Sequence, residues 1–342
     1  FSTRDELGSR GIVAHFGAEV SSINPDDCSV SFADGRVLHV GTIVLATGGT
    51  PRTLSLPGAE DPKVLTLRTL SDAQRIATTL SAGKAAAIIG AGLIGAELAS
   101  ALNSSGVRVT LIEPAALPLA RAVGEQMAGY LHDMHHQHGV EVIQSTPRAV
   151  TSAGEQLTVE LESGEGVSAD LVVVSVGISP TVDLAEQAGL AVDDGVIVDA
   201  SYRTSNDRVF CVGDAARIAT GDAASHRHEH WEAAKLAGEA VAGALMGENL
   251  PEPGSPWFWS DRYGVHVEVV GRLTGSGTTV IRATSPHPAF FLIDGEHLVG
   301  AGTIDDSQTV RASRRIIDKQ IPVSVQQLED PSLSLRELLR AA

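Results

Sequence analysis

Residues 85–113 decide the fold, and they read AAAIIGAGLIGAELASALNSSGVRVTLIE. An apolar run, a glycine turn, a helical segment and a second apolar run follow one another, which predicts a strand, a helix and a parallel strand. Gly90 permits the tight turn, Gly92 lets the backbone approach a phosphate, and Gly95 lets the helix pack closely on the strand. The start of the helix offers unpaired N–H groups to an anion. The stretch therefore predicts a dinucleotide-binding βαβ unit.

An acid closes this unit and indicates which dinucleotide it takes. Glu113 ends the second strand roughly 20 residues after the glycines, where a carboxylate accepts hydrogen bonds from a ribose 2′-hydroxyl and repels a 2′-phosphate. We therefore expect NADH rather than NADPH. A glycine turn that serves only close packing is the alternative, and a lone G-x-G-x-x-G would leave it open. The flanking strands and the spaced acid favour the nucleotide.

Composition limits the classes of protein that remain. The chain has 342 residues, of which 43% are hydrophobic and 20% charged, enough for two or three soluble domains. Its formal net charge of −17 argues against binding nucleic acid. The two cysteines, Cys28 and Cys211, are far apart, which excludes a C-x-x-C pair and favours a reducing cytoplasm. No run is long enough to span a membrane, and we expect no bound metal.

Strand, helix and turn signals divide the chain into four predicted segments. Residues 1–63 and 189–252 contain short β-prone runs that end in glycines, and residues 64–188 contain the nucleotide unit. The linker P-E-P-G at 251–254 marks the next boundary, and residues 253–342 predict an α+β domain without nucleotide signals. We expect an α/β protein with two Rossmann-like dinucleotide-binding domains and a C-terminal α+β domain.

A second strand end also carries an acid. Residues 209–212 predict a strand that ends on Gly213 and Asp214, which places this carboxylate at the carboxyl edge of a sheet. Such an acid can hold the hydroxyls of a ribityl chain, although Gly-Asp after a strand is more often a simple turn. The order of Ala46-Thr47-Gly48, the nucleotide unit and Gly213-Asp214 along the chain favours the cofactor interpretation.

That order resembles the two-dinucleotide-binding flavoprotein reductases, and among them the oxygenase-coupled ferredoxin and rubredoxin reductases. The segments that carry the resemblance are LATGGTPR (45–52), LRTLSDA (67–73), GAGLIGAE (90–97), VGISP (176–180), FCVGDAAR (210–217), HEHWEAA (228–234) and WFWSD (257–261). WFWSD is the most specific of them, because the glycine motifs are shared more widely. The family begins with its own strand and glycine turn for FAD, whereas this sequence begins at Phe1. We therefore expect the first FAD-binding segment to be N-terminally truncated.

The resemblance implies two cofactors and the residues that hold them. FAD would contact Thr47, Gly48, Arg52, Arg68, Gly213, Asp214 and Trp231. NADH would lie on Gly90, Gly92, Ile94, Gly95, Glu113 and Gly177. Glu97 would lie near the nicotinamide carboxamide, and Trp231 near the flavin ring at the start of a helix whose dipole faces the flavin; these two are the expected catalytic residues. Core packing of Trp231 is an equally good alternative.

The resemblance also implies a function and a partner. The chain would be an NADH-dependent FAD reductase that passes electrons to a ferredoxin or rubredoxin of an oxygenase system, as a monomer or homodimer. Four basic residues on one predicted helix, Arg311, Arg314, Arg315 and Lys319, could dock this acidic iron–sulfur protein. An NADH oxidase or an apoptosis-inducing-factor-like flavoprotein is an alternative with the same chemistry. A flavin-free, non-catalytic NAD-binding fragment is an alternative of another class.

Overall fold

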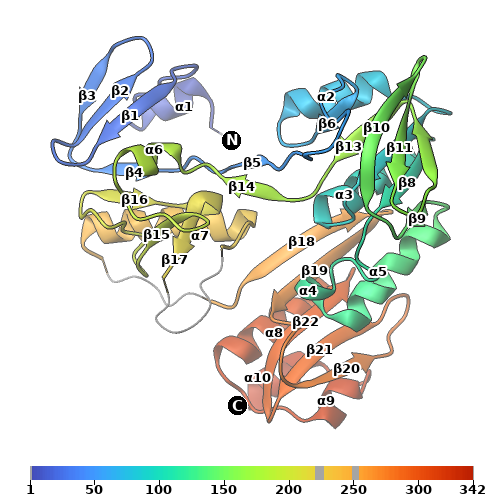
Figure 1. Ribbon diagram of the computed structural model, residues 1–342. Coiled ribbons are helices and arrows are strands. Elements are labelled where there is room, and N and C mark those ends of the chain that lie inside the picture. Colours follow the sequence, from blue (N-terminus) through green and yellow to red (C-terminus); the bar gives the residue numbers. More distant parts are fainter. Residues whose placement is uncertain (1, 220–226, 249–253, 342) are drawn as a thin grey trace. The chain divides into compact units, whose positions relative to one another are not determined.

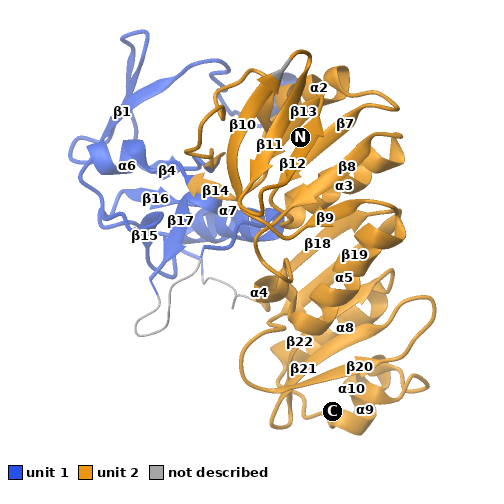
Figure 2. Cartoon of the chain, turned by 45° about the vertical axis from the view of Figure 1, so that its right-hand side comes forward, with its two compact units in different colours: residues 1–49, 180–251 blue, residues 50–179, 252–342 orange. Residues whose placement is uncertain are grey.

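The computed structural model describes residues 2–219, 227–248 and 254–341 (Figure 1). The chain forms two compact units, coloured separately in Figure 2: residues 1–49 with 180–251, and residues 50–179 with 252–342. The chain therefore leaves the first unit, builds part of the second, returns, and leaves again. The predicted boundary at residues 252–253 lies outside the described residues.

The second unit contains the sheet that the glycine motif belongs to. Its five strands lie in the order β6-β13-β7-β8-β9 and are all parallel. They span Val64–Thr66 (β6), Leu171–Val174 (β13), Ala85–Ile89 (β7), Arg108–Ile112 (β8) and Glu141–Ile143 (β9). Every residue of β7 and β13 is buried. This is expected of central strands in a parallel sheet, whose two faces are both covered.

Helices and a second sheet accompany this parallel sheet. The helices are α2 (Leu70–Thr79), α3 (Leu93–Ser104), α4 (Ala120–Val123) and α5 (Glu125–Gln137). An antiparallel meander follows, formed by β10 (Pro147–Ala153), β11 (Gln156–Leu161) and β12 (Gly166–Ala169). Its inward residues, such as Leu157 and Val159, share one apolar cluster with β7 and β13. The meander therefore seals a face of the parallel sheet.

The C-terminal part of the second unit is an antiparallel sheet with helices, as the sequence predicted. Its strands lie in the order β18-β19-β22-β21-β20. They span Trp257–Arg262 (β18), Val265–Gly271 (β19), His297–Ile304 (β22), Ala289–Asp294 (β21) and Thr278–Arg282 (β20). The helices are α8 (Ser307–Asp318), α9 (Val325–Glu329) and α10 (Leu335–Ala341). Val310 and Ile316 of α8 are buried against this sheet, which leaves the basic side of α8 outside the core.

The first unit is built from smaller sheets. An antiparallel meander comprises β1 (Val20–Asn24), β2 (Ser29–Phe32) and β3 (Val37–His39). Two parallel pairs follow, β4 (Ile43–Leu45) with β16 (Val209–Cys211) and β15 (Val196–Val198) with β17 (Ala216–Ile218). The helices are α1 (Arg4–Ser9), α6 (Asp183–Gln187), α7 (Trp231–Met246) and the 3-10 turn η1 (Gly213–Ala215). Finally, β5 (Gly49–Pro51) pairs with β14 (Ile178–Pro180) where the chain passes from one unit to the other, so both strands belong partly to the second unit.

Candidate functional site

The turn after β7 leaves no room for side chains at two of its three glycines. Gly90 has a φ of +103°, and a Cβ atom there would lie 2.2 Å from the Ser175 carbonyl oxygen. A Cβ atom on Gly95 would lie 2.0 Å from the carbonyl oxygen of Gly90. The helix α3 therefore starts directly against the end of β7, as the motif predicted.

The third glycine of the motif faces open space. A Cβ atom on Gly92 would meet nothing within 4 Å. Gly92 is also the N-cap of α3, and no side chain caps this helix end. The first N–H groups of a 12-residue helix are thus left to an external acceptor. Ile94 beside them is 40% exposed, which is unusual for an isoleucine and leaves an apolar surface next to the turn. These residues fit a dinucleotide pyrophosphate.

Glu113 lies at the end of β8 and is held in place by two backbone groups. Its Oε2 accepts a hydrogen bond from the Ala91 N–H at 3.0 Å, and its Oε1 accepts one from the Ala115 N–H at 2.9 Å. Ala91 belongs to the glycine turn, so the carboxylate and the helix N-terminus share one edge of the sheet. A carboxylate at this place can accept bonds from ribose hydroxyls.

A loop that contains Gly177 follows β13, the strand next to β7. Gly177 has a φ of +99° and open space on the side where a Cβ atom would lie. Its carbonyl oxygen accepts from the Arg52 N–H at 2.9 Å, and the Arg52 Nε donates to the Ile178 oxygen at 3.0 Å. The carboxyl ends of β7, β8 and β13 thus carry Gly90, Glu113 and Gly177 side by side, where ligands of open parallel sheets bind.

Glu97 projects from the second turn of α3 and meets the C-terminal sheet. Its Oε1 accepts a hydrogen bond from the Asp261 N–H at 3.1 Å. One turn further along α3, the Ser100 Oγ accepts from the Tyr263 N–H at 2.6 Å. A groove of about 360 Å³ opens at this place, and Glu97, Ser100, Asp261, Arg262, Tyr263 and His266 are among the residues that line it. The partners of Glu97 lie more than 150 residues away in sequence, and neither composition nor spacing indicated them.

In the first unit, the strands β4 and β16 end at one common edge. They are parallel, with Leu45 opposite Cys211, and the Val212 N–H donates to the Leu45 oxygen at 2.9 Å. Thr47 and Gly48 follow β4, while Gly213 and Asp214 follow β16. The structure therefore brings together four residues that the resemblance implied for FAD.

The loops after these strands are fixed by backbone contacts. The Thr47 Oγ1 donates to the Thr181 oxygen at 2.6 Å, and the Gly48 oxygen accepts from the Thr181 N–H at 2.9 Å. Gly213 has a φ of +68°, and a Cβ atom there would lie 3.5 Å from the Ala234 Cβ of α7. The Gly-Asp turn therefore lies against the start of α7.

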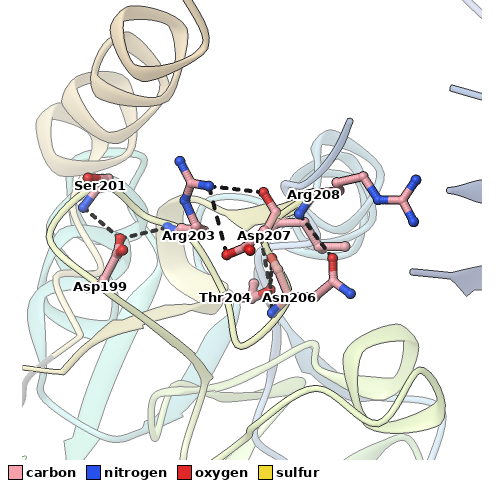
Figure 3. Close-up of polar contacts among 8 residues, drawn as sticks. Asp199, Ser201, Arg203, Thr204, Asn206, Asp207 and Arg208 are labelled. Atoms are coloured by element: carbon pink, nitrogen blue, oxygen red, sulfur yellow. Dashed lines mark hydrogen bonds and ion pairs between the residues drawn. The ribbon is translucent and has the colours of Figure 1, made fainter. Parts of the chain in front are cut away.

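A polar loop before β16 sets the direction of this strand (Figure 3). The Asp199 Oδ1 accepts from the N–H groups of Ser201 and Arg203 at 2.8 and 3.0 Å. The Asn206 Oδ1 accepts from the Arg208 N–H at 2.9 Å, and the Arg203 Nη1 donates to the Asp207 oxygen at 3.2 Å. These bonds stabilise the turn that precedes β16, the strand that Gly213 and Asp214 follow.

The N-terminus of α7 lies next to the Gly-Asp turn. Trp231 is the first residue of this helix and is 63% exposed. The N-cap His230 makes no capping bond through its side chain, and burial lowers its pKa, the charge of neighbouring His228 adding to the shift and that of Asp214 opposing it. The exposure of Trp231 disfavours the core-packing alternative. An exposed indole can stack on a planar ligand.

Two residues that the resemblance implies for FAD, Arg52 and Arg68, belong to the second unit. The other implied FAD residues, Thr47, Gly48, Gly213, Asp214 and Trp231, belong to the first unit. Arg68 precedes the N-cap Thr69 of α2, and its N–H donates to the Asp72 Oδ2 at 3.2 Å. The role of each of these residues stays a prediction.

The histidines of α5 contact one another through their rings. The rings of His132 and His136 are 5.3 Å apart and nearly perpendicular. No group of three or more His, Cys, Asp or Glu side chains in the described part of the chain could hold a metal ion. His135 instead bonds to the Tyr263 hydroxyl at 2.6 Å, and His138 stacks on the Tyr263 ring.

Comparisons with known proteins agree with this geometry. Residues 4–238 match the family described as pyridine nucleotide-disulphide oxidoreductase, and residues 257–339 match the reductase C-terminal family. The chain is 34% identical over 334 residues to the ferredoxin–NAD(+) reductase component of the anthranilate 1,2-dioxygenase system of Burkholderia cepacia. That match covers 96% of this chain and 82% of the relative. Among the described residues, no helix is long and apolar enough to cross a membrane.

Two further relatives support the same relationship. The chain is 32% identical to rhodocoxin reductase of Rhodococcus erythropolis, over 94% of this chain and 76% of the relative. The solved covalent putidaredoxin reductase–putidaredoxin complex superimposes with a TM-score of 0.94 at 30% identity, covering 100% of this chain and 84% of that one. The predicted fold class and the predicted family are confirmed: the chain belongs to the pyridine nucleotide-disulphide oxidoreductase family of flavoproteins, in the branch that carries the reductase C-terminal domain.

Proposed function

We propose that the chain is an NADH-dependent FAD reductase that passes electrons from NADH to a ferredoxin or rubredoxin of an oxygenase system, in the cytoplasm. The observation that carries the proposal is the pair of strand edges, one with an open helix N-terminus and Glu113, the other with Asp214 and an exposed Trp231. Relatives named as ferredoxin–NAD(+) reductase and putidaredoxin reductase support it over nearly the whole chain.

The residues of the chain bind and orient, and the cofactors supply the redox chemistry. A bound flavin accepts a pair of electrons from a nicotinamide and can release them singly to an iron–sulfur centre. We assign Gly92, Ile94 and Glu113 to holding NADH, and Asp214 to the ribityl chain. Glu97 would accept a hydrogen bond from the carboxamide of the nicotinamide, and Trp231 would cover the ring of the flavin. The four-segment division, with FAD-binding parts at 1–63 and 189–252, belongs to this proposal.

The two cysteines support an acceptor outside the chain. Cys211 is fully buried, and this burial raises the pKa of its thiol to about 12, so the thiol stays protonated. Cys28 is 1% exposed and its Sγ donates to the Gly41 oxygen at 3.5 Å. Neither thiol can serve as an accessible nucleophile, which disfavours a disulfide substrate.

The partner would dock on α8. Arg311 and Arg315 are exposed on this helix, Arg314 is half-buried, and Lys319 follows the last turn as an exposed residue. A chain with a net charge of −17 that keeps these cations on one helix offers a local positive surface to an acidic protein.

The test compares a large acceptor with a small one. We expect the double variant Arg311→Glu/Arg315→Glu to reduce a [2Fe–2S] ferredoxin roughly ten times more slowly at low salt, with ferricyanide reduction unchanged. Arg108→Glu is the matched control, because Arg108 is exposed at the opposite, amino end of β8. Reduction of ferricyanide and oxygen but of neither ferredoxin nor rubredoxin would favour the NADH oxidase alternative. A colourless, flavin-free protein would favour the NAD-binding fragment.

A further inference from the structure

A cation is buried on the apolar side of β18. Phe258, Ser260 and Arg262 alternate on one face of this strand, and Phe258 packs with Val267 and Val269 against residues of α5. The alternation calls for an apolar residue at the last of these positions. Arg262 stands there instead and is only 2% exposed, so it is the largest fully buried side chain among the described residues.

The guanidinium is poorly satisfied by hydrogen bonds. Its Nη2 donates to the Ser260 Oγ at 3.0 Å. Its Nε and Nη1 have no hydrogen-bond partner among the described residues. An arginine keeps its charge in proteins, and an unpaired buried charge costs several kcal/mol by general estimates. A residue held at such a cost calls for a compensating charge nearby.

Several titratable groups lie near Arg262, and not all of them can supply that charge. They are Glu97 on α3; His135 on α5; Asp261, Tyr263 and His266 on the hairpin; and Asp305 before α8. Burial and the charge of Arg262 lower the pKa of His135 to about 3, which keeps it neutral. Burial raises the pKa of Tyr263 to about 12, which keeps its hydroxyl protonated. Burial lowers the pKa of Arg262 itself, and among the acids Glu97 is the one whose charge opposes that shift.

The hairpin that carries Arg262 also holds Glu97 by its backbone. Tyr263 and Gly264 form the two-residue turn, with φ values of +52° and +78°. The residue before Arg262 donates its N–H to the Glu97 carboxylate, and the residue after it donates to Ser100 on the same helix. Residues 261–263 therefore contact one side of α3, through the backbone N–H groups of Asp261 and Tyr263.

We propose that Arg262 is a positioning residue, which holds Glu97 as an ordered carboxylate at the groove where the nicotinamide carboxamide binds. The inference rests on the proposed function, which places the nicotinamide beside Glu97. Arg262 itself would touch neither cofactor. Its charge would act through Glu97, because the side chain is only 2% exposed and its Nε and Nη1 are buried.

A double-mutant cycle tests this coupling without turnover. The probe is 1,4,5,6-tetrahydro-NAD, an unreactive NADH analogue with an uncharged ring, and its affinity is measured by calorimetry on the FAD-loaded protein. We expect Arg262→Met to weaken binding roughly tenfold in the wild-type background but less than twofold in Glu97→Gln, since coupled residues are not additive. Arg262→Lys should restore most of the loss, because it restores the charge.

Each other outcome decides a different point. Equal losses in both backgrounds would overturn the positioning role and leave Arg262 as a structural residue. An unchanged affinity in Glu97→Gln would instead remove Glu97 from the nicotinamide site and with it the site assignment above. Arg282→Met is the matched control, because the Arg282 Nε, Nη1 and Nη2 donate to the oxygens of Leu328, Leu333 and Gln327. It should lower the melting temperature and leave the affinity unchanged.

Discussion

The two strand edges that carry the proposed cofactor residues both combine parallel strand ends, a glycine turn and a helix. They differ in how tightly their glycines are packed. At the nucleotide edge of the second unit, Gly90 and Gly95 are packed so tightly that a Cβ atom would lie within about 2 Å of a backbone oxygen. At the edge of the first unit, a Cβ atom on Gly213 would lie at an ordinary 3.5 Å from its neighbour. The nucleotide edge of the second unit is thus fixed by backbone packing within one contiguous βαβ unit. The edge of the first unit depends instead on the pairing of β4 with β16, which are far apart in sequence.

The largest expected effect comes from filling the tight turn. Gly95→Ala should move α3 away from β7 and destabilise the protein by roughly 3 kcal/mol, the upper range for overpacking. The change is measured as a drop in the melting temperature together with loss of binding of the unreactive NADH analogue. Gly92→Ala is the control, since open space surrounds that position. It should weaken binding and keep the melting temperature, and equal melting temperatures in both variants would contradict the comparison.

A substitution of Asp214 tests the strand edge of the first unit, where the glycine is less tightly packed. Asp214→Ala should release FAD, with affinity reduced by roughly 30-fold if the carboxylate makes a charged hydrogen bond worth about 2 kcal/mol. Flavin absorbance per mole of protein gives the occupancy. Asp207→Ala is a matched control in the same unit, because its side chain is 94% exposed and makes only a 3.9 Å ion pair with Arg203. Full occupancy in both variants would remove Asp214 from the FAD site.

Substitutions of Glu113 test which dinucleotide the strand edge of the second unit prefers. Glu113→Ala should reduce the ratio of kcat/KM for NADH to that for NADPH about tenfold, because the ribose loses an acceptor and the 2′-phosphate loses a repulsive charge. Glu113→Gln separates these effects, since it removes the charge but can still accept from the Ala91 N–H. An unchanged ratio in both variants would refute the assignment.

The last expected effect concerns the pH dependence of stability near the hairpin. Burial lowers the pKa of His135 from 6.5 to about 3, so between these pH values the unfolded chain binds a proton that the folded chain does not. The free energy of unfolding should therefore fall as the pH drops from 6.5 toward 3, by at most about 1.4 kcal/mol per unit. His135→Asn should flatten this slope in urea titrations. His39→Asn, on the exposed strand β3, should leave it unchanged.

Sequence predicted what is encoded locally. The βαβ unit from β7 to β8 lies within 29 consecutive residues, and its glycines, helix and closing acid lie where the pattern indicated. The meander β10–β12 was missed, although its alternation of buried Leu157, Val159 and Leu161 with more exposed residues was readable. The common edge of Thr47 and Asp214 came from a family resemblance, because nothing local to either segment indicates the pairing of β4 with β16.

The contacts of Glu97 could not be predicted at all. Asp261 and Tyr263 reach α3 only because a tight hairpin turn presents their N–H groups to Glu97 and Ser100. Arg262 gave one signal, a charge at a position where alternation calls for an apolar side chain. That signal becomes meaningful only once the burial of the residue is known.

The turn at Tyr263 and Gly264 has a consequence for the exchange of amide hydrogens. The Asp261 and Tyr263 N–H groups are bonded to side chains of α3, not to a neighbouring strand. Their protection against exchange with solvent therefore depends on the hairpin staying docked, whereas the amides between β18 and β19 depend only on the sheet. Deuterium uptake at these two positions measures how often the C-terminal sheet leaves the nucleotide-binding helix, even when both remain folded.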